Sequence, residues 1–204
     1  MNKLEYSIYI AEQKIRMEKG YLTRSERDKL KHMIANPKIY IKDELQVNKG
    51  KSIITNRQLL EKPCELITKE DNIKEIIQDL KDTLNTFSNK AVGLSANQIG
   101  INKRISYIKI PKAVNKEIQY TEYVIINAKI LEKERIIQVK NESCLSFPGI
   151  PVTTKRYVFI TVEYYNEKME PQTRILQDFE ALVIQHECDH QSGITIFQRK
   201  WVGR

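Results

Sequence analysis

Apolar residues recur at helical spacing in three parts of the chain. The clearest part is residues 71–87, where Asp71 is a suitable N-cap for a stripe of apolar positions. The segment Phe179–His190 predicts a second helix. Residues 4–35 are polar but also helical in pattern, with Ser25 placed to cap a second helix before the break at Asn36-Pro37. The apolar positions are Leu4, Ile8, Ala11, Ile15, Leu30 and Ile34 within residues 4–35, and Ile73, Ile76, Ile77, Leu80, Leu84 and Phe87 within residues 71–87.

β-branched and aromatic residues form runs of strand length between the two strongest helices. A long helix, several strands and a final helix make an α+β order, without the regular alternation of a parallel sheet. Asn48-Lys49-Gly50 reads as a turn, so we expect a helical, basic N-terminal extension over residues 1–50 and a catalytic domain over residues 51–204. The predicted strands are Ile105–Ile110, Tyr123–Ile126, Ile136–Val139 and Val158–Tyr164.

Composition narrows the class of protein. Hydrophobic residues make up 41% of the 204, enough for a core, but no stretch without Asp, Glu, Lys or Arg exceeds 12 residues. A membrane span needs about 18 apolar residues, so we expect no membrane association. The N-terminus lacks an apolar signal core and carries acidic residues, which predicts a cytoplasmic protein.

The net charge of +8 is denser at the N-terminus, where residues 1–50 hold 11 basic and 7 acidic side chains. A basic excess suits an acidic partner such as ribosomal RNA, although solubility alone also explains it. There is no basic run of five and no aromatic-interleaved nucleic-acid motif, so DNA binding is not expected.

The strongest chemical signal is the sequence Gln185-His186-Glu187-Cys188-Asp189-His190. On a helix, His186 and His190 lie about 40° apart around the axis and can bind one divalent metal, with Glu187 placed as general base. An ordinary helix with two polar histidines is the alternative, but these are two of only three histidines in the chain. A hydrolytic site also needs a third protein ligand.

The 14 residues after His190 contain no Asp, Glu, His or Cys, so we expect the third ligand upstream. Cys188 lies about 200° around the helix from His186 and is expected to be a buried apolar side chain. Cys64, beside Pro63, is expected to be structural. Cys144 remains, and the residues alone leave two interpretations open, a metal ligand or a buried structural thiol.

Three motifs in order resemble those of the peptide deformylases. Gly93-Leu94-Ser95-Ala96-Asn97-Gln98 is similar to the family's Gly-hydrophobic-Ala-Ala-x-Gln, and Glu142-Ser143-Cys144-Leu145-Ser146 to Glu-Gly-Cys-Leu-Ser. The third, residues 185–190, is similar to Gln-His-Glu-x-Asp-His. The resemblance covers about residues 51–204 and implies antiparallel sheets packed around a central metal-binding helix.

The resemblance also implies an activity, a metal and roles for individual residues. It implies removal of the formyl group from formyl-methionyl nascent polypeptides, with release of formate, and possible contact with the ribosome. The metal, Fe²⁺ with Zn²⁺, Ni²⁺ or Co²⁺ as substitutes, would be held by Cys144, His186 and His190. Glu187 would transfer protons, while the Gln98 side-chain amide and the Leu145 backbone N–H would stabilise the oxyanion.

Substrate contacts follow from the same resemblance. Phe179, Leu182 and Val183 match the family's methionine pocket, although core residues would look the same. The backbone of Val92, Gly93 and Glu142 would pair with an extended peptide. Asp189 and Arg156 would orient a histidine or Glu142, unless they form only a surface ion pair.

Several positions depart from the family pattern. Ala91 and Ser143 replace glycines, Gln191 replaces a Leu, and Pro151 stands where many bacterial members have an Arg. The short segment after the last motif resembles that of some organellar and virus-encoded members. Two other functions therefore compete with an active deformylase: a metallopeptidase, and a catalytically weakened module that binds ribosomal RNA through residues 1–50.

Overall fold

The structure is a computed structural model that describes residues 22–35, 50–87, 91–114 and 117–202. The chain divides into two compact units, Met1–Asn48 and Lys49–Arg204. The helical pattern predicted before residue 22 lies outside the described residues. No helix within the described ranges combines the length and the apolar character that a membrane crossing requires.

In the first unit, helix α2 (Arg24–Ala35) begins one residue after Thr23. The Glu26 N–H donates to Thr23 Oγ1 at 3.3 Å, and the Glu26 carboxylate accepts the Thr23 N–H at 2.7 Å. This reciprocal pair is a capping box, which needs Thr and Glu three residues apart. The predicted helix is correct, but its predicted cap is wrong, because Ser25 lies inside the helix.

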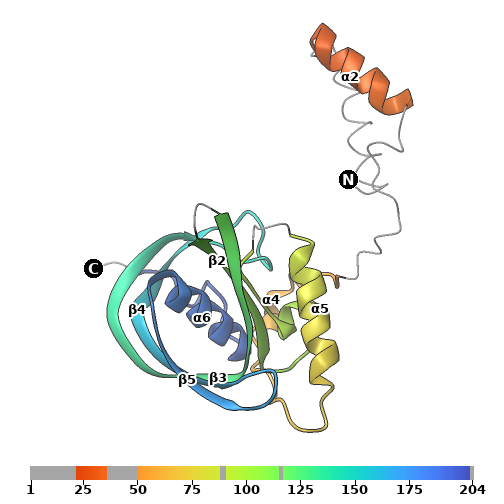
Figure 1. Ribbon diagram of the computed structural model, residues 1–204. Helices are drawn as coiled ribbons and strands as arrows, with labels where there is room; N and C mark the ends of the chain where they lie inside the picture. The colour runs from red at the N-terminus through yellow and green to blue at the C-terminus, as the bar shows by residue number, and fades with distance from the viewer. Residues whose placement is uncertain (1–21, 36–49, 88–90, 115–116, 203–204) are drawn as a thin grey trace. The chain divides into compact units, whose positions relative to one another are not determined.

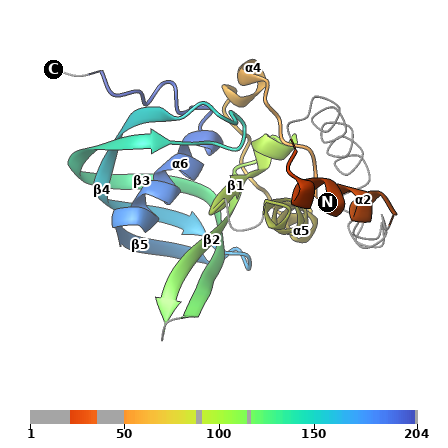
Figure 2. The same cartoon turned by 90° about the horizontal axis from the view of Figure 1, so that it is seen from above.

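The second unit contains one five-stranded antiparallel sheet that curves around a helix (Figures 1 and 2). The strands follow one another in chain order, β1-β2-β3-β4-β5, so each lies beside its neighbour in the sequence. The predicted α+β class is confirmed. The elements are α4 (Arg57–Leu60), α5 (Ile73–Asn85), β1 (Gly93–Ser95), the 3₁₀ helix η1 (Ala96–Ile99), β2 (Ile105–Val114), β3 (Glu117–Glu142), β4 (Val152–Tyr165), β5 (Pro171–Gln177) and α6 (Asp178–Gln191).

Alternate residues of the central strands pack against different helices. Ile105 and Tyr107 of β2 lie in the core cluster of α5, whereas Ile108 lies in the core cluster of α6. In β3, Val124 and Ile125 divide in the same way. Because side chains of a strand alternate between its faces, the sheet separates α5 on its outer side from α6 within its curve (Figure 2).

Strand β3 is a single strand of 26 residues, although two of the predicted strands fall within it. Its pairing with β4 shifts register at three places, between Ile126 and Lys129, between Ile130 and Glu132, and between Val139 and Glu142. Such bulges bend a strand and increase its twist. They let β3 curve around α6 without ending.

Two sequence predictions at the helices have different outcomes. The helix predicted over Phe179–His190 is α6. The helix predicted over residues 71–87 is α5, but Asn72 rather than Asp71 caps it, with Asn72 Oδ1 accepting the Glu75 N–H. The Asp71 carboxylate instead accepts the Thr68 N–H at 2.7 Å, which closes the preceding turn.

Candidate metal centre

Two segments bring three possible ligands together. Cys144 follows the end of β3, and His186 and His190 lie one turn apart on α6. Their ligand atoms all lie within 4.8 Å of one another. Cys144 Sγ lies 3.2 Å from His190 Nε2, and the two imidazole rings are 5.0 Å apart at their centroids.

This donor set fits a divalent metal ion. A tetrahedral ion with ordinary Zn–S and Zn–N bond lengths would bring sulfur and nitrogen to about 3.6 Å apart. His186 Nδ1 is bonded to Glu142, which leaves Nε2 for the cluster. Burial holds the pKa of His190 well below its usual value, so this imidazole is neutral in the folded chain. The second ring nitrogen, His190 Nδ1, is buried without a hydrogen-bond partner among the described residues.

Glu142 fixes the orientation of His186. Its Oε1 lies 2.7 Å from His186 Nδ1, and its Oε2 accepts the Thr154 hydroxyl and the Arg156 Nε–H. Burial alone would raise the pKa of Glu142, but hydrogen bonds with His186 and Arg156 outweigh burial and keep that pKa well below its usual value. A charged carboxylate on the outer nitrogen orients a metal-binding imidazole.

Arg156 connects Glu142 to α6. Its side chain is only 2% exposed and donates to Glu142 Oε1 and to Asp189 Oδ2, each at 2.5 Å. Asp189 also receives two hydrogen bonds from Arg199, near the C-terminal end of the described chain. The alternative of a surface ion pair is therefore wrong for Arg156.

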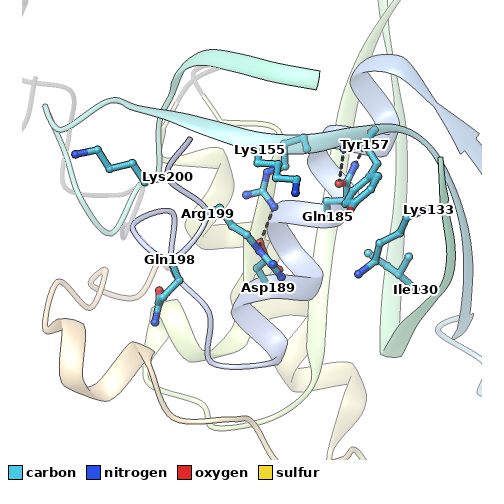
Figure 3. A pocket seen from close by; sticks show the side chains of 10 residues that line it. Ile130, Lys133, Lys155, Tyr157, Gln185, Asp189, Gln198, Arg199 and Lys200 are labelled. Carbon is cyan, nitrogen blue, oxygen red and sulfur yellow. Dashed lines mark hydrogen bonds and ion pairs between the residues drawn. The ribbon is translucent and has the colours of Figure 1, made fainter. Parts of the chain in front are cut away.

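A cavity of about 150 Å³ opens on the side of α6 that carries Gln185 and Asp189 (Figure 3). Figure 3 shows the Arg199 and Asp189 side chains close together and Gln185 beside Tyr157, whose N–H donates to Gln185 Oε1. None of Cys144, His186 and His190 lines this cavity. The cavity is thus separate from the three possible ligands.

The carboxylate of Glu187 lies against β1. Oε2 accepts the Ser95 hydroxyl at 2.6 Å. A Cβ added at Gly93 would come within 2.5 Å of Oε1, so only glycine allows this close approach. Burial raises the pKa of Glu187, while the hydrogen bond from Ser95 opposes that rise.

The two residues expected to bind an oxyanion lie beside Cys144. Gln98 Oε1 accepts the Ser95 N–H at 2.9 Å, which turns the Nε2 amide toward Cys144 Sγ, 3.5 Å away, and Ser146 Oγ, 3.2 Å away. Leu145 directly follows Cys144, and its backbone N–H has no protein acceptor within the described ranges. The Gln98 amide thus points toward Cys144, and the Leu145 N–H is left without a protein acceptor in the described part of the chain.

The residues expected to contact substrate are less closely grouped. Phe179 is 52% exposed, Leu182 is half-buried, and Val183 is buried in the core cluster of α6. Gly93 lies in β1, which is an edge strand of the sheet. The Val92 carbonyl already accepts the Lys109 N–H at 2.9 Å, so the Val92 carbonyl is occupied by β2.

Sequence reasoning missed two buried residues near Glu187. Ser95 stands at the first Ala of the family-like motif, and that mismatch was the available signal. Gln191 was noted only as a departure, yet it is fully buried and accepts the Ala128 N–H while donating to Ser106 and to the Ile125 carbonyl. Of the other departures, Ser143 and Pro151 are exposed, and Ala91 is half-buried.

Comparison with known proteins identifies relatives over most of this unit. The family model described as "Polypeptide deformylase" matches residues 50–201. A peptide deformylase of Aquifex aeolicus is 38% identical over 148 residues, which are 72% of this chain and 85% of that protein. One of Elusimicrobium minutum is 40% identical over 149 residues, 72% of this chain and 81% of that protein.

A solved structure gives the same result for the fold. The crystal structure of peptide deformylase from Thermotoga maritima matches with a TM-score of 0.64 and 31% sequence identity. The match covers 74% of this chain and 97% of that one. The second unit therefore has the architecture of that enzyme.

Proposed function

The chain belongs to the polypeptide deformylase family, and from that premise we propose how its residues carry out deformylation. The chain is a deformylase, an enzyme that removes N-formyl groups from nascent peptides. The observation that carries the mechanism is the convergence of one thiol and two imidazoles beside a buried glutamate.

Cys144, His186 and His190 would hold one divalent metal, with Glu142 orienting His186 from behind. When bound, such a metal supplies Lewis-acid activation of water and of the formyl carbonyl. The mixture of one thiolate and two imidazoles suits Fe²⁺, Zn²⁺, Ni²⁺ and Co²⁺. We propose Fe²⁺ as the native ion, with the other three as substitutes.

Glu187 moves the protons of the reaction. Its carboxylate accepts a proton from the attacking water as the water oxygen bonds to the formyl carbon. It then delivers that proton to the leaving amine nitrogen as the C–N bond breaks, which yields formate and a free N-terminus. Burial of Glu187 supports this role, because a raised pKa brings the carboxylate closer to neutral pH.

Gln98 and Leu145 stabilise the negative charge that develops on the formyl oxygen. The Gln98 Nε2 amide is held toward Cys144 by the Ser95 N–H, and the Leu145 N–H comes from the residue next to Cys144. Removing one donor of this kind costs about 2.7–4 kcal/mol in the transition state. Preorganised donors of this kind need no rearrangement during the reaction.

The peptide would add to the sheet at β1. Gly93 offers an edge strand next to Glu187, and Glu142 ends β3 near Cys144. Strand addition orders an extended peptide through backbone hydrogen bonds. Leu182 and Phe179, with Val183 behind them in the core, would form the methionine pocket.

Residues 1–50 are proposed as a basic extension that contacts the ribosome. Their support is the denser positive charge and the separate compact unit Met1–Asn48. A salt-sensitive affinity for ribosomal RNA that is lost when residues 1–48 are deleted would support this contact. Retention of full affinity after the deletion would contradict it.

Formate release from a formyl-methionyl peptide tests the function. The full chain is loaded anaerobically with Fe²⁺, because a ferrous centre with a cysteine ligand is sensitive to oxidation. We expect formate and a free methionyl amine, and no cleavage of the same peptide without its formyl group. A metal-loaded protein that releases no formate, or one that cleaves the unblocked peptide bond, would contradict the proposal.

A further inference from the structure

Three buried polar side chains link the end of α6 to the carboxylate of Glu187. Gln191 Nε2 donates to Ser106 Oγ at 2.9 Å, Ser106 Oγ lies 2.7 Å from Ser95 Oγ, and Ser95 Oγ donates to Glu187 Oε2 at 2.6 Å. Ser95, Ser106 and Gln191 are each at most 1% exposed. Ser95 and Ser106 are direct cross-strand partners in β1 and β2.

The direction of these hydrogen bonds is fixed by the backbone around Gln191. Gln191 Oε1 accepts the Ala128 N–H at 3.1 Å, and Nε2 also donates to the Ile125 carbonyl at 3.1 Å. Turning the amide over would place a donor against an N–H and an acceptor against a carbonyl. Ser106 Oγ therefore accepts a hydrogen bond from the Gln191 amide.

The remaining protons then point toward Glu187. Because Ser106 already accepts from Gln191, its own hydroxyl proton is available for Ser95 Oγ. Ser95 in turn donates to Glu187 Oε2, which is the nearest acceptor. With the opposite direction, the Ser106 proton would have no acceptor and Glu187 would lose its donor, at the cost of leaving buried polar groups unsatisfied.

Two departures from the family-like motifs meet in this network. Ser95 stands where the family motif quoted above has Ala, and Gln191 stands where the family usually has Leu. Neither Ala nor Leu can form a side-chain hydrogen bond, so a chain with the motif residues at both positions could not form this network.

We propose that Ser95 is a positioning residue for the catalytic base, and that Gln191 orients Ser95 through Ser106. By holding Oε2, Ser95 leaves Oε1, the oxygen against Gly93, to exchange the proton with water and with the leaving amine. The inference rests on the proposed role of Glu187. It assigns a function to a serine and a glutamine that the known reaction does not otherwise require.

Variants of the full, metal-loaded chain test this arrangement through kcat and KM for formate release. Ser95→Ala and Gln191→Leu restore the motif residues, so both replacements suit the family fold. Ser106→Ala interrupts the link between them. Ser192→Ala, an exposed serine at the end of α6, is the matched control, and bound metal per chain and thermal unfolding are measured for every variant.

We expect Ser95→Ala to lower kcat by about tenfold with KM and metal content unchanged, because a hydrogen bond to a charged group is lost. Gln191→Leu and Ser106→Ala should each lower kcat by about threefold, since Ser95 can then rotate. The Ser95→Ala/Gln191→Leu double variant should match Ser95→Ala alone, because Gln191 acts only through Ser95. Ser192→Ala should behave like the unaltered chain.

Three outcomes would overturn the inference. They are a kcat within about twofold of the unaltered chain for Ser95→Ala, losses that multiply in the double variant, and a fall in kcat that follows loss of metal. Effects that act only through folding stability would add in the double variant, and they would not lower kcat while leaving KM unchanged. If the unaltered chain releases no formate, the proposed function fails; if it does and Ser95→Ala is unaffected, only this inference fails.

Discussion

Two of the three possible metal ligands have polar neighbours on their outer side. His186 is oriented by Glu142, whereas Cys144 lies next to Gln98 and His190. The other two thiols have different surroundings: burial raises the pKa of Cys64 to about 11 and that of Cys188 to about 12. Both therefore remain protonated at neutral pH, as buried thiols without a metal do.

Glu187→Gln separates proton transfer from metal binding. Gln keeps the shape of the side chain and an oxygen that can accept the Ser95 hydroxyl, but it cannot take a proton. We expect kcat for formate release to fall by about 10²–10⁴-fold with unchanged metal content. Glu167→Gln, at an exposed turn, is the control and should leave kcat unaltered.

A Glu187→Gln variant that kept kcat within about tenfold would show that another group moves the protons.

The roles of single residues were only partly predictable. The His-Glu-x-x-His spacing indicates two ligands and a base, since helix geometry fixes their directions. The choice of Cys144 stayed open in the residues alone, because its partner segments are brought together by the fold.

At the scale of elements, one buried arginine ties three of them together. Arg156 of β4 donates to Glu142 of β3 and to Asp189 of α6. Removing the arginine would leave Glu142 without its guanidinium partner, whereas Asp189 would keep Arg199. The network therefore ties β3 and β4 to the helix that carries the histidines.

Arg156→Met should lower the free energy of unfolding by about 3–5 kcal/mol. It should also weaken metal affinity by about 10–100-fold, because Glu142 no longer holds His186 in place. Urea unfolding and competition with a chelator measure the two effects. Arg57→Met, which removes an ion pair with Glu61 and a cation–π contact with Phe197, is the control and should cost at most about 2 kcal/mol.

An Arg156→Met variant as stable as the Arg57→Met control would contradict this role.

The elements themselves were predictable where the pattern was strong, as in α5 and α6. β3 was predicted as two separate strands because its bulges interrupt the alternation of apolar residues. β1 and β5 were missed, since β1 has three residues and β5 begins with Pro171 and buries only Leu176 among its side chains.

For the molecule as a whole, stability should fall in alkaline solution. Burial, together with hydrogen bonds to Glu122 and Glu180, raises the pKa of Tyr107 and Tyr123 well above the usual value. Unfolded tyrosines ionise near pH 10, whereas the folded chain keeps both protons. Above that pH the unfolded state binds fewer protons, so the free energy of unfolding decreases as the pH rises.

The Tyr107→Phe/Tyr123→Phe variant should lose less stability than the unaltered chain between about pH 9 and about pH 11. Urea unfolding across that range measures the difference, and Tyr165→Phe, a partly exposed tyrosine, is the control. Equal slopes for the double variant and the unaltered chain would contradict the assignment.

Fold class and the central place of α6 were predictable from element order and from the resemblance of three motifs. That one continuous sheet curves around α6 was not predictable, because it depends on bulges and on contacts between residues far apart in the sequence, such as Arg156 with Asp189. The job of residues 1–50 also stays a prediction, since their charge fits both RNA contact and solubility.

X-ray absorption at the metal edge of the zinc-loaded chain tests the central claim most directly. The account predicts one sulfur at about 2.3 Å and two imidazole nitrogens at about 2.0–2.1 Å, with the sulfur lost in Cys144→Ser. A metal bound without sulfur, or a sulfur that persists in Cys144→Ser, would contradict the convergence of Cys144, His186 and His190 on one ion.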